Sequence, residues 1–229
     1  MAKIDALDKK ERQNYIAKNV ALLLDGGLVN LGIGLPTKVP NFLPEGVELI
    51  LHSENGYTGM GPAPKDENDP IYDDHIVTAG GMPSSVLPGA AFFDSCTSFG
   101  IVRGGHLDAT ILGALEIDQE GNLANYMVPG KMVPGMGGAM DLVSGAKKVI
   151  VAMEHCAKNG SAKILKKCTL PLTAEKCVDY VVTEYCVLKF TDKGYELVSL
   201  NKDVTIEELK NATEADIIVP ENYGEMVEL

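Results

Sequence analysis

An apolar run that ends in polar residues and then in glycines limits the folds that are open to this chain. The run from Val47 to Leu51 has the length and composition of a buried strand. The polar stretch Ser53-Glu54-Asn55-Gly56 follows it, and Gly59 and Gly61 predict a sharp loop beyond. Ligands bind at the carboxyl ends of strands in open α/β sheets, so Glu54 would stand at a functional edge. Taken alone, the same pattern is also that of a surface turn.

Composition excludes several classes of protein. The formal net charge of −12 argues against nucleic-acid binding, which needs a cationic face. No apolar stretch approaches the length of a membrane span, and Met1 to Ser53 has no pattern of a secretory signal. The 5 cysteines form no C-x-x-C pair and the 4 histidines are scattered, which predicts reduced thiols and no metal site. We therefore expect a cytoplasmic protein that binds neither nucleic acid nor membrane.

The order of predicted elements indicates an α/β protein. Apolar spacing and helix-end signals predict a helix over 8–25, a strand over 28–31 and a short helix over 37–43. Further strands are expected at 75–78, 109–117, 149–153, 178–182, 185–190, 195–200 and 217–219, and further helices at 94–102, 139–145 and 205–211. The segment 83–93 is apolar but is interrupted by Pro88-Gly89. The expected fold is one domain over residues 1–229 with an open, mostly parallel sheet flanked by helices.

A dinucleotide site is the first functional hypothesis. Gly32 and Gly34 follow a predicted strand, and Glu54 lies about 20 residues further on, where an acid would bind a ribose. However, Thr37 occupies the third glycine position, and the helix that follows is short for such a unit. The pattern is an incomplete fingerprint of an NAD-binding protein.

Covalent catalysis by a carboxylate is the second hypothesis. Glu54 can attack an acyl centre if it is positioned and desolvated. The attack creates an oxyanion, and backbone N–H groups in Gly137-Gly138-Ala139 can stabilise it. The alternative for these glycines is an ordinary tight turn. The sequence predicts that Glu54, the Gly32/Gly34 loop and the Gly135–Ala139 loop meet at one sheet edge.

Five stretches, in order, resemble family I coenzyme A transferases. Residues 53–62 resemble the glutamate motif of the family, and 29–36 precede it in the expected place. The segments 87–93 and 103–106, Arg103-Gly104-Gly105-His106, follow, and then residues 129–142. The resemblance runs from about residue 10 to 215. It is greatest to the β subunit of the two-chain 3-oxoacid enzymes, such as the acetate or butyrate–acetoacetate transferases.

The resemblance implies a mechanism and a set of site residues. Glu54 would be the nucleophile that carries a glutamyl-CoA thioester, and Gly138 and Ala139, with Gly137 as a neighbour, would supply the oxyanion donors. The remaining candidates for contacts with substrate or coenzyme A are Asn55, Gly59, Gly61, Gly32 and Gly34.

Coenzyme A would be a substrate, with no permanently bound cofactor and no metal. The resemblance also implies an α subunit as partner, in an α2β2 assembly. Acetate, butyrate, acetoacetate and 3-oxoadipate are all open as acids. A third hypothesis is a ligand-sensing relative without catalytic activity. The presence of both Glu54 and the Gly137–Ala139 loop argues against it.

Overall fold

The computed structural model describes residues 8–131 and 135–228. Its helices are α1 (Lys9–Ala21), the 3-10 helix η2 (Leu35–Phe42), α2 (Ser95–Arg103), α3 (Ala139–Gly145) and α4 (Ile206–Asn211). The strands of the main sheet are β1 (Gly27–Leu31), β2 (Leu49–Ser53), β3 (Tyr57–Met60), β4 (Val86–Phe92), β5 (Ala109–Leu112), β8 (Val149–Ala152), β10 (Tyr180–Val182), β11 (Cys186–Thr191), β12 (Gly194–Leu200), β13 (Ile217–Ile218) and β14 (Gly224–Glu225). A small sheet contains β6 (Glu116–Asp118), β7 (Leu123–Ala124) and β9 (Ile164–Leu165).

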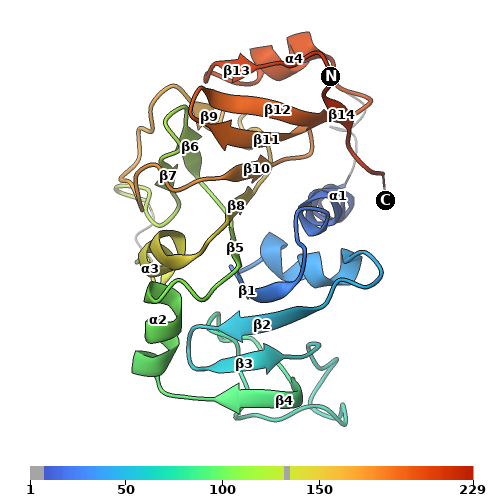
Figure 1. Ribbon diagram of the computed structural model, residues 1–229, viewed down its shortest axis with the longest axis vertical. Helices are drawn as coiled ribbons and strands as arrows, with labels where there is room; N and C mark the ends of the chain where they lie inside the picture. The colour runs from blue at the N-terminus through green and yellow to red at the C-terminus, as the bar shows by residue number, and fades with distance from the viewer. Residues whose placement is uncertain (1–7, 132–134, 229) are drawn as a thin grey trace.

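The main sheet runs through the length of the molecule (Figure 1). Its strand order is β13-β12-β11-β10-β8-β5-β1-β2-β3-β4, and β14 pairs with β12. Strands β10, β8, β5, β1 and β2 pair in parallel, whereas β3, β4 and β11 form antiparallel pairs. The predicted open, mostly parallel sheet flanked by helices is therefore confirmed for its central strands.

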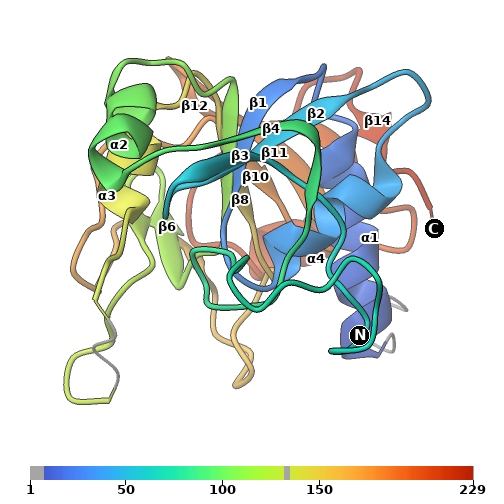
Figure 2. The ribbon, with the colours of Figure 1, turned by 90° about the horizontal axis from the view of Figure 1, so that it is seen from below.

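Helices cover both faces of this sheet. Figure 2 shows α2 and α3 on one face and α1 on the other. Every residue of β5 and β8 is buried, as expected of parallel strands that are covered on both sides. The carboxyl ends of β1 and β2 lie side by side, because Asn30 is paired with His52. The edge that the sequence predicts for the site is therefore formed by neighbouring parallel strands.

The first helix begins where predicted and ends earlier. The Asp8 side chain accepts from the backbone N–H of Glu11, and the Glu11 side chain accepts in return from Asp8, which completes a capping box. The helix ends at Ala21 rather than near residue 25, because the chain tightens into a turn in which Leu24 N–H donates to the Ala21 carbonyl. Gly26 and Gly27, both with positive φ, then turn the chain into β1.

Two strands lie where the sequence indicates irregular chain. The glycine-rich residues after Glu54 form β3, and the segment that contains Pro88 and Gly89 forms β4. β4 stands at the end of the strand order, where proline is tolerated because one side of the strand needs no partner. The register shifts between Thr58 and Met60, which accommodates the positive φ of Gly59. The prediction of a plain loop here is wrong, because pairing with neighbours outweighs weak strand propensity.

Three other boundaries differ from prediction. The expected strand 75–78 is reduced to an isolated bridge between Val77 and Pro83. The expected strand 109–117 divides at Gly113 into β5 of the main sheet and β6 of the small sheet. The short helix 37–43 is a 3-10 helix that starts at Leu35 and includes Pro40.

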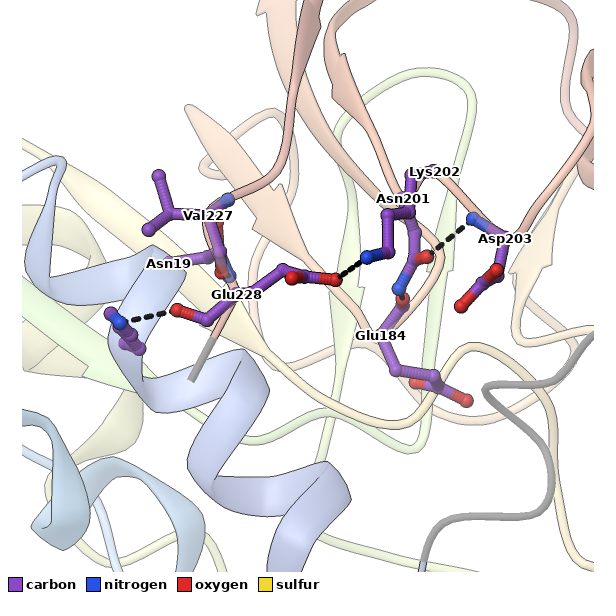
Figure 3. A network of polar contacts seen from close by, with 8 residues as sticks. Asn19, Glu184, Asn201, Lys202, Asp203, Val227 and Glu228 are labelled. Carbon is purple, nitrogen blue, oxygen red and sulfur yellow. Dashed lines mark hydrogen bonds and ion pairs between the residues drawn. The ribbon is translucent and has the colours of Figure 1, made fainter.

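The carboxyl-terminal tail is fastened to α1. Asn19 donates from Nδ2 to the Val227 carbonyl and accepts from the Val227 N–H, each at 3.0 Å (Figure 3). The backbone carbonyl of Glu228 accepts a hydrogen bond from the Lys18 ammonium group, and the Glu228 carboxylate forms an ion pair with Lys202. Asn201, next to Lys202 in the loop after β12, donates to the Glu184 carbonyl at 3.1 Å. The tail therefore joins the first helix to the loop after β12.

Two further observations concern membranes and metals. Within residues 8–131 and 135–228, no helix has the length and apolar character that a bilayer span requires. In the same residues, no three His, Cys, Asp or Glu side chains are grouped so that they could hold a metal ion.

Candidate active site

Glu54 is the first residue after β2, and its carboxylate is held from the neighbouring strand. Asn30 of β1 donates from Nδ2 to Glu54 Oε2 at 2.9 Å. The same amide nitrogen lies 3.2 Å from the His52 carbonyl oxygen. Asn30 is buried, whereas Glu54 is partly exposed. The buried amide therefore fixes the orientation of a carboxylate that substrate can reach.

His52 connects this amide to helix α2. Its Nε2 lies 3.0 Å from Ser98 Oγ, and its Nδ1 lies 3.3 Å from Asn30 Nδ2. Burial lowers the pKa of His52, and the negative charge of Glu54 offsets part of that effect. A neutral imidazole accepts from Asn30 at Nδ1 and donates from Nε2 to Ser98. His52 is thus a structural link in a chain of contacts from α2 to Glu54.

The glycine loop before α3 lies against Glu54. A Cβ atom built on Gly138 would lie 3.4 Å from Cγ of Glu54 and 3.2 Å from Cε1 and Cζ of Phe99. The structure thus places Glu54 and the Gly138 loop together, and the Gly32/Gly34 loop follows β1 at the same edge of the sheet. Met132, Val133 and Pro134, also part of the resemblance, lie outside the described residues.

The backbone of this loop bears on the predicted oxyanion donors. Gly138 is the residue that precedes α3, and Gly137 has a φ of 53°. The N–H of Ala139 donates to the Met136 carbonyl at 3.1 Å. Ala139 would have to share or release that bond to bind an oxyanion. Gly138 is therefore the better placed of the two predicted donors.

The other predicted contacts have structural explanations. A Cβ on Gly59 would lie 2.8 Å from Cα of Ala90, and one on Gly61 would lie 2.6 Å from Ser85 Oγ. Gly32 packs as closely, because a Cβ there would lie 3.0 Å from the Ile111 carbonyl oxygen. These glycines allow close packing of the chain beside the site, and a role in binding coenzyme A stays a prediction for each.

Gly34 and Asn55 differ from these packed glycines. Gly34 has a φ of 85°, and no atom lies within 4 Å of a Cβ built there. Within this chain, Gly34 is therefore explained by its positive φ and not by close packing. The Asn55 side chain donates to the Val77 carbonyl at 2.8 Å, so it holds the loop above β2. Contacts of either residue with substrate stay predictions.

The segment after Gly34 is unsuited to a dinucleotide. A pyrophosphate site needs a helix of several turns whose amino terminus faces the phosphates. Here the 3-10 helix η2 follows, with proline at its start and Pro40 inside it. Glu54, the candidate ribose-binding acid, accepts a hydrogen bond from Asn30. This geometry disfavours the NAD-binding hypothesis.

Comparison with known proteins decides the family. The family described as "Coenzyme A transferase" matches residues 13–212. The chain belongs to the coenzyme A transferase family. This transferase chain is of the β-subunit type within family I. It is 56% identical over 216 residues to the beta subunit of acetate CoA-transferase from Haemophilus influenzae, and the match covers 93% of this chain and 95% of the relative.

A second relative and a solved structure extend the comparison. The transferase chain is 45% identical over 226 residues to the mitochondrial succinyl-CoA:3-ketoacid coenzyme A transferase 2A of Mus musculus, covering 97% of this chain and 43% of that one. The crystal structure of acyl-CoA transferase (YdiF) from Escherichia coli O157:H7 superposes with a TM-score of 0.70 at 19% identity. The match covers 96% of this chain and 44% of that chain, so this chain spans less than half of either longer protein. At 19% identity the structural likeness shows the fold.

Sequence reasoning missed three residues of the site. Asn30 left a signal, because it is a polar residue inside the apolar run Leu28-Val29-Asn30-Leu31 and stands just before Gly32. Ser98 and Phe99 left none, because their contacts with His52 and Gly138 depend on how α2 packs on the sheet.

Proposed function

We propose that this chain transfers coenzyme A between an acyl-CoA and a short-chain carboxylic or 3-oxo acid, through a covalent thioester on Glu54. The observation that supports this most is the environment of Glu54. A buried amide donates to one carboxylate oxygen at 2.9 Å, and a Cβ built on Gly138 would lie 3.4 Å from Cγ of the same residue. A carboxylate that is oriented in this way, with a glycine backbone beside it, suits nucleophilic attack on an acyl carbon.

The proposed reaction starts with attack by a Glu54 oxygen on the thioester carbonyl. The C–S bond breaks, the coenzyme A thiolate leaves, and an acyl-glutamyl anhydride forms. The thiolate then attacks Cδ of Glu54, and cleavage of the C–O bond releases the first acid as its carboxylate. The second acid attacks the resulting thioester, and the same steps in reverse order give the new acyl-CoA. No net proton transfer is needed, because each nucleophile is an anion and each leaving group departs as one.

Two different oxyanions arise in this sequence, and the site offers a donor for each. When the substrate carbonyl is attacked, its oxygen becomes negative, and the Gly138 N–H is the proposed donor. When Cδ of Glu54 is attacked, the negative oxygen belongs to Glu54, and Asn30 Nδ2 already lies 2.9 Å from one of its oxygens. A single donor of this kind generally contributes about 2.7–4 kcal/mol to transition-state stability.

The proposal includes a partner chain. The Haemophilus influenzae relative is named as a beta subunit, and the Mus musculus relative and the longer solved structure each contain more than twice the length that this chain matches. We infer that an α subunit completes the site, in an α2β2 assembly, and that it contributes to binding coenzyme A. We expect the isolated chain to be inactive and the reconstituted complex to be active. Full exchange activity of the isolated chain would contradict the partnership.

The test of the function is exchange of labelled coenzyme A between acyl donors in the reconstituted complex. We expect exchange in the wild type and none in Glu54→Gln, because an amide is a poor nucleophile. Glu48→Gln is the matched control, since Glu48 is an exposed glutamate near the other end of the same strand. Absence of exchange in the wild type across acetate, butyrate, acetoacetate and 3-oxoadipate would contradict transfer between these acids. Normal exchange in Glu54→Gln would contradict the role of Glu54.

A further inference from the structure

Two residues of the family-like stretches have no part in the proposed reaction, yet they contact each other. Arg103 is the last residue of α2, and Asp141 lies in the first turn of α3. Arg103 Nε donates to Asp141 Oδ1 at 2.6 Å. The side chains are 69% and 28% exposed, so the pair lies at the surface. It joins the end of one helix to the beginning of the next along the sheet face.

The same guanidinium group lies over an aromatic ring of the site. The Arg103 Cζ atom is 5.9 Å from the centre of the Phe99 ring. The Phe99 ring in turn faces Gly138, where a Cβ would lie 3.2 Å from two ring atoms and 3.4 Å from Glu54 Cγ. Close approaches therefore continue from Arg103 through Phe99 and Gly138 to Glu54.

Helices α2 and α3 are also packed with almost no space between them. A Cβ on Gly145 would lie 2.1 Å from the Val102 carbonyl oxygen, so only glycine fits at that crossing. Helix α2 also reaches Glu54 through Ser98, His52 and Asn30. Helix α2 thus contacts the nucleophile through one series of residues and the glycine loop through another.

The Arg103–Asp141 ion pair can matter for the geometry of the site even if it contributes little to folding stability. Exposed ion pairs contribute little to the stability of a folded protein. A displacement of about 1 Å in a reacting group can nevertheless lower a rate by roughly 10². The Arg103–Asp141 contact restrains the first turn of α3, and Gly138 directly precedes that helix. A small rotation of α3 would therefore move Gly138 relative to Glu54.

We propose that Arg103 and Asp141 are positioning residues, which hold the Gly138 loop at its working distance from Glu54 by fixing α3 to α2 across Phe99. The inference rests on the proposed function, because it assigns the pair to the oxyanion step of that reaction. Neither side chain contacts the reacting atoms in this scheme, so both act through Phe99 and Gly138.

The test compares Arg103→Met, Asp141→Asn and the double variant in the reconstituted complex. Each single variant should lower kcat for coenzyme A exchange by roughly 10-fold to 100-fold and leave KM for acyl-CoA within about twofold. The double variant should be no slower than the slower single variant, because both changes break one contact. Melting temperature and assembly with the α subunit should change little.

Lys147→Met is the matched control. Lys147 pairs with Asp108 at 2.9 Å and is 62% exposed, but it stands before β8, at the end of the sheet away from Glu54. It should keep normal kcat. Unchanged kcat in Arg103→Met with an active wild type would contradict the positioning role alone, as would additive losses in the double variant or failure of the variants to assemble. An inactive wild-type complex would contradict the proposed function, and this inference with it.

Discussion

At the scale of single residues, Asn30 is the amide on which the orientation of Glu54 depends. Asn30→Ala removes the donor at 2.9 Å, and we expect kcat for coenzyme A exchange to fall by roughly 10²–10³. Asn30→Asp should be at least as slow, because a carboxylate cannot donate to Glu54 and repels its negative charge. Steady-state exchange rates of the two variants test this. Asn211→Ala, exposed at the end of α4, is the control. A rate in Asn30→Ala equal to that of the control would contradict the role of the amide.

Gly138 supplies the second prediction at this scale. A β-branched side chain in Gly138→Val would collide with the Phe99 ring and approach Glu54. The loop must then shift, and its N–H moves away from the developing oxyanion. Steady-state kinetics should show a lower kcat with little change in KM for acyl-CoA, because the donor acts on the transition state. An unchanged kcat would remove the loop from the mechanism.

At the scale of elements, the contact between α1 and the tail is the feature that is simplest to test. Asn19 is buried and makes both a donor and an acceptor contact with Val227. Asn19→Ala leaves two backbone groups unpaired, and we expect the free energy of unfolding to fall by about 1–3 kcal/mol. Urea denaturation measures it. Asn68→Ala in an exposed turn should change stability by less than about 0.5 kcal/mol. Equal effects of the two substitutions would contradict a stabilising role for the contact between α1 and the tail.

The same scale shows what sequence patterns predict and what they miss. Helix starts are well predicted, because Asp8 and Thr205 cap their helices through contacts within three residues. The place of Glu54 after β2 follows from an apolar run with a polar end. Strand β4 was missed because Pro88 and Gly89 disfavour a strand locally, and only pairing with β3 makes it one. Local sequence patterns do not predict long-range contacts such as the pairing of β3 with β4.

The inability of local patterns to predict long-range contacts also explains which residues of the candidate site were missed. The proximity of Glu54 and Gly138 was predicted from chemistry, because a carboxylate nucleophile needs backbone donors beside it for the oxyanion. The contact of Asn30 with Glu54 depends on the register of β1 against β2. The contact of Phe99 with Gly138 depends on the packing of α2. Register and helix packing are properties of the folded chain, so neither residue was found.

At the scale of the whole molecule, stability should depend on pH through a buried histidine. His155 is fully buried, with its ring nitrogens each 3.0 Å from the hydroxyls of Thr183 and Thr213. Burial, assisted by the positive charge of Lys163, lowers the pKa of His155 to about 3. Glu184 also faces it, accepting from the His155 backbone N–H at 2.9 Å.

The sign of the effect follows from this shift. Below about pH 6.5 the unfolded chain binds a proton at His155 and the folded chain does not, so stability is lost as the pH falls. The loss from this group approaches about 1.4 kcal/mol per pH unit until the pKa of the folded state near 3 is reached. Urea denaturation from pH 7 to 4.5 measures it. His155→Gln should be less stable at pH 7 but should show a smaller slope, and an unchanged slope would contradict the assignment.

If Glu54 carries coenzyme A as a thioester, that intermediate can be trapped on the protein. Borohydride reduces thioesters but not carboxylates, so it should inactivate the reconstituted complex only after acyl-CoA is added without an acceptor acid. Mass spectrometry should then find the reduced residue at position 54, and Glu54→Gln should show no modification. Borohydride resistance of an active complex after acyl-CoA treatment, or modification at another residue, would contradict the account.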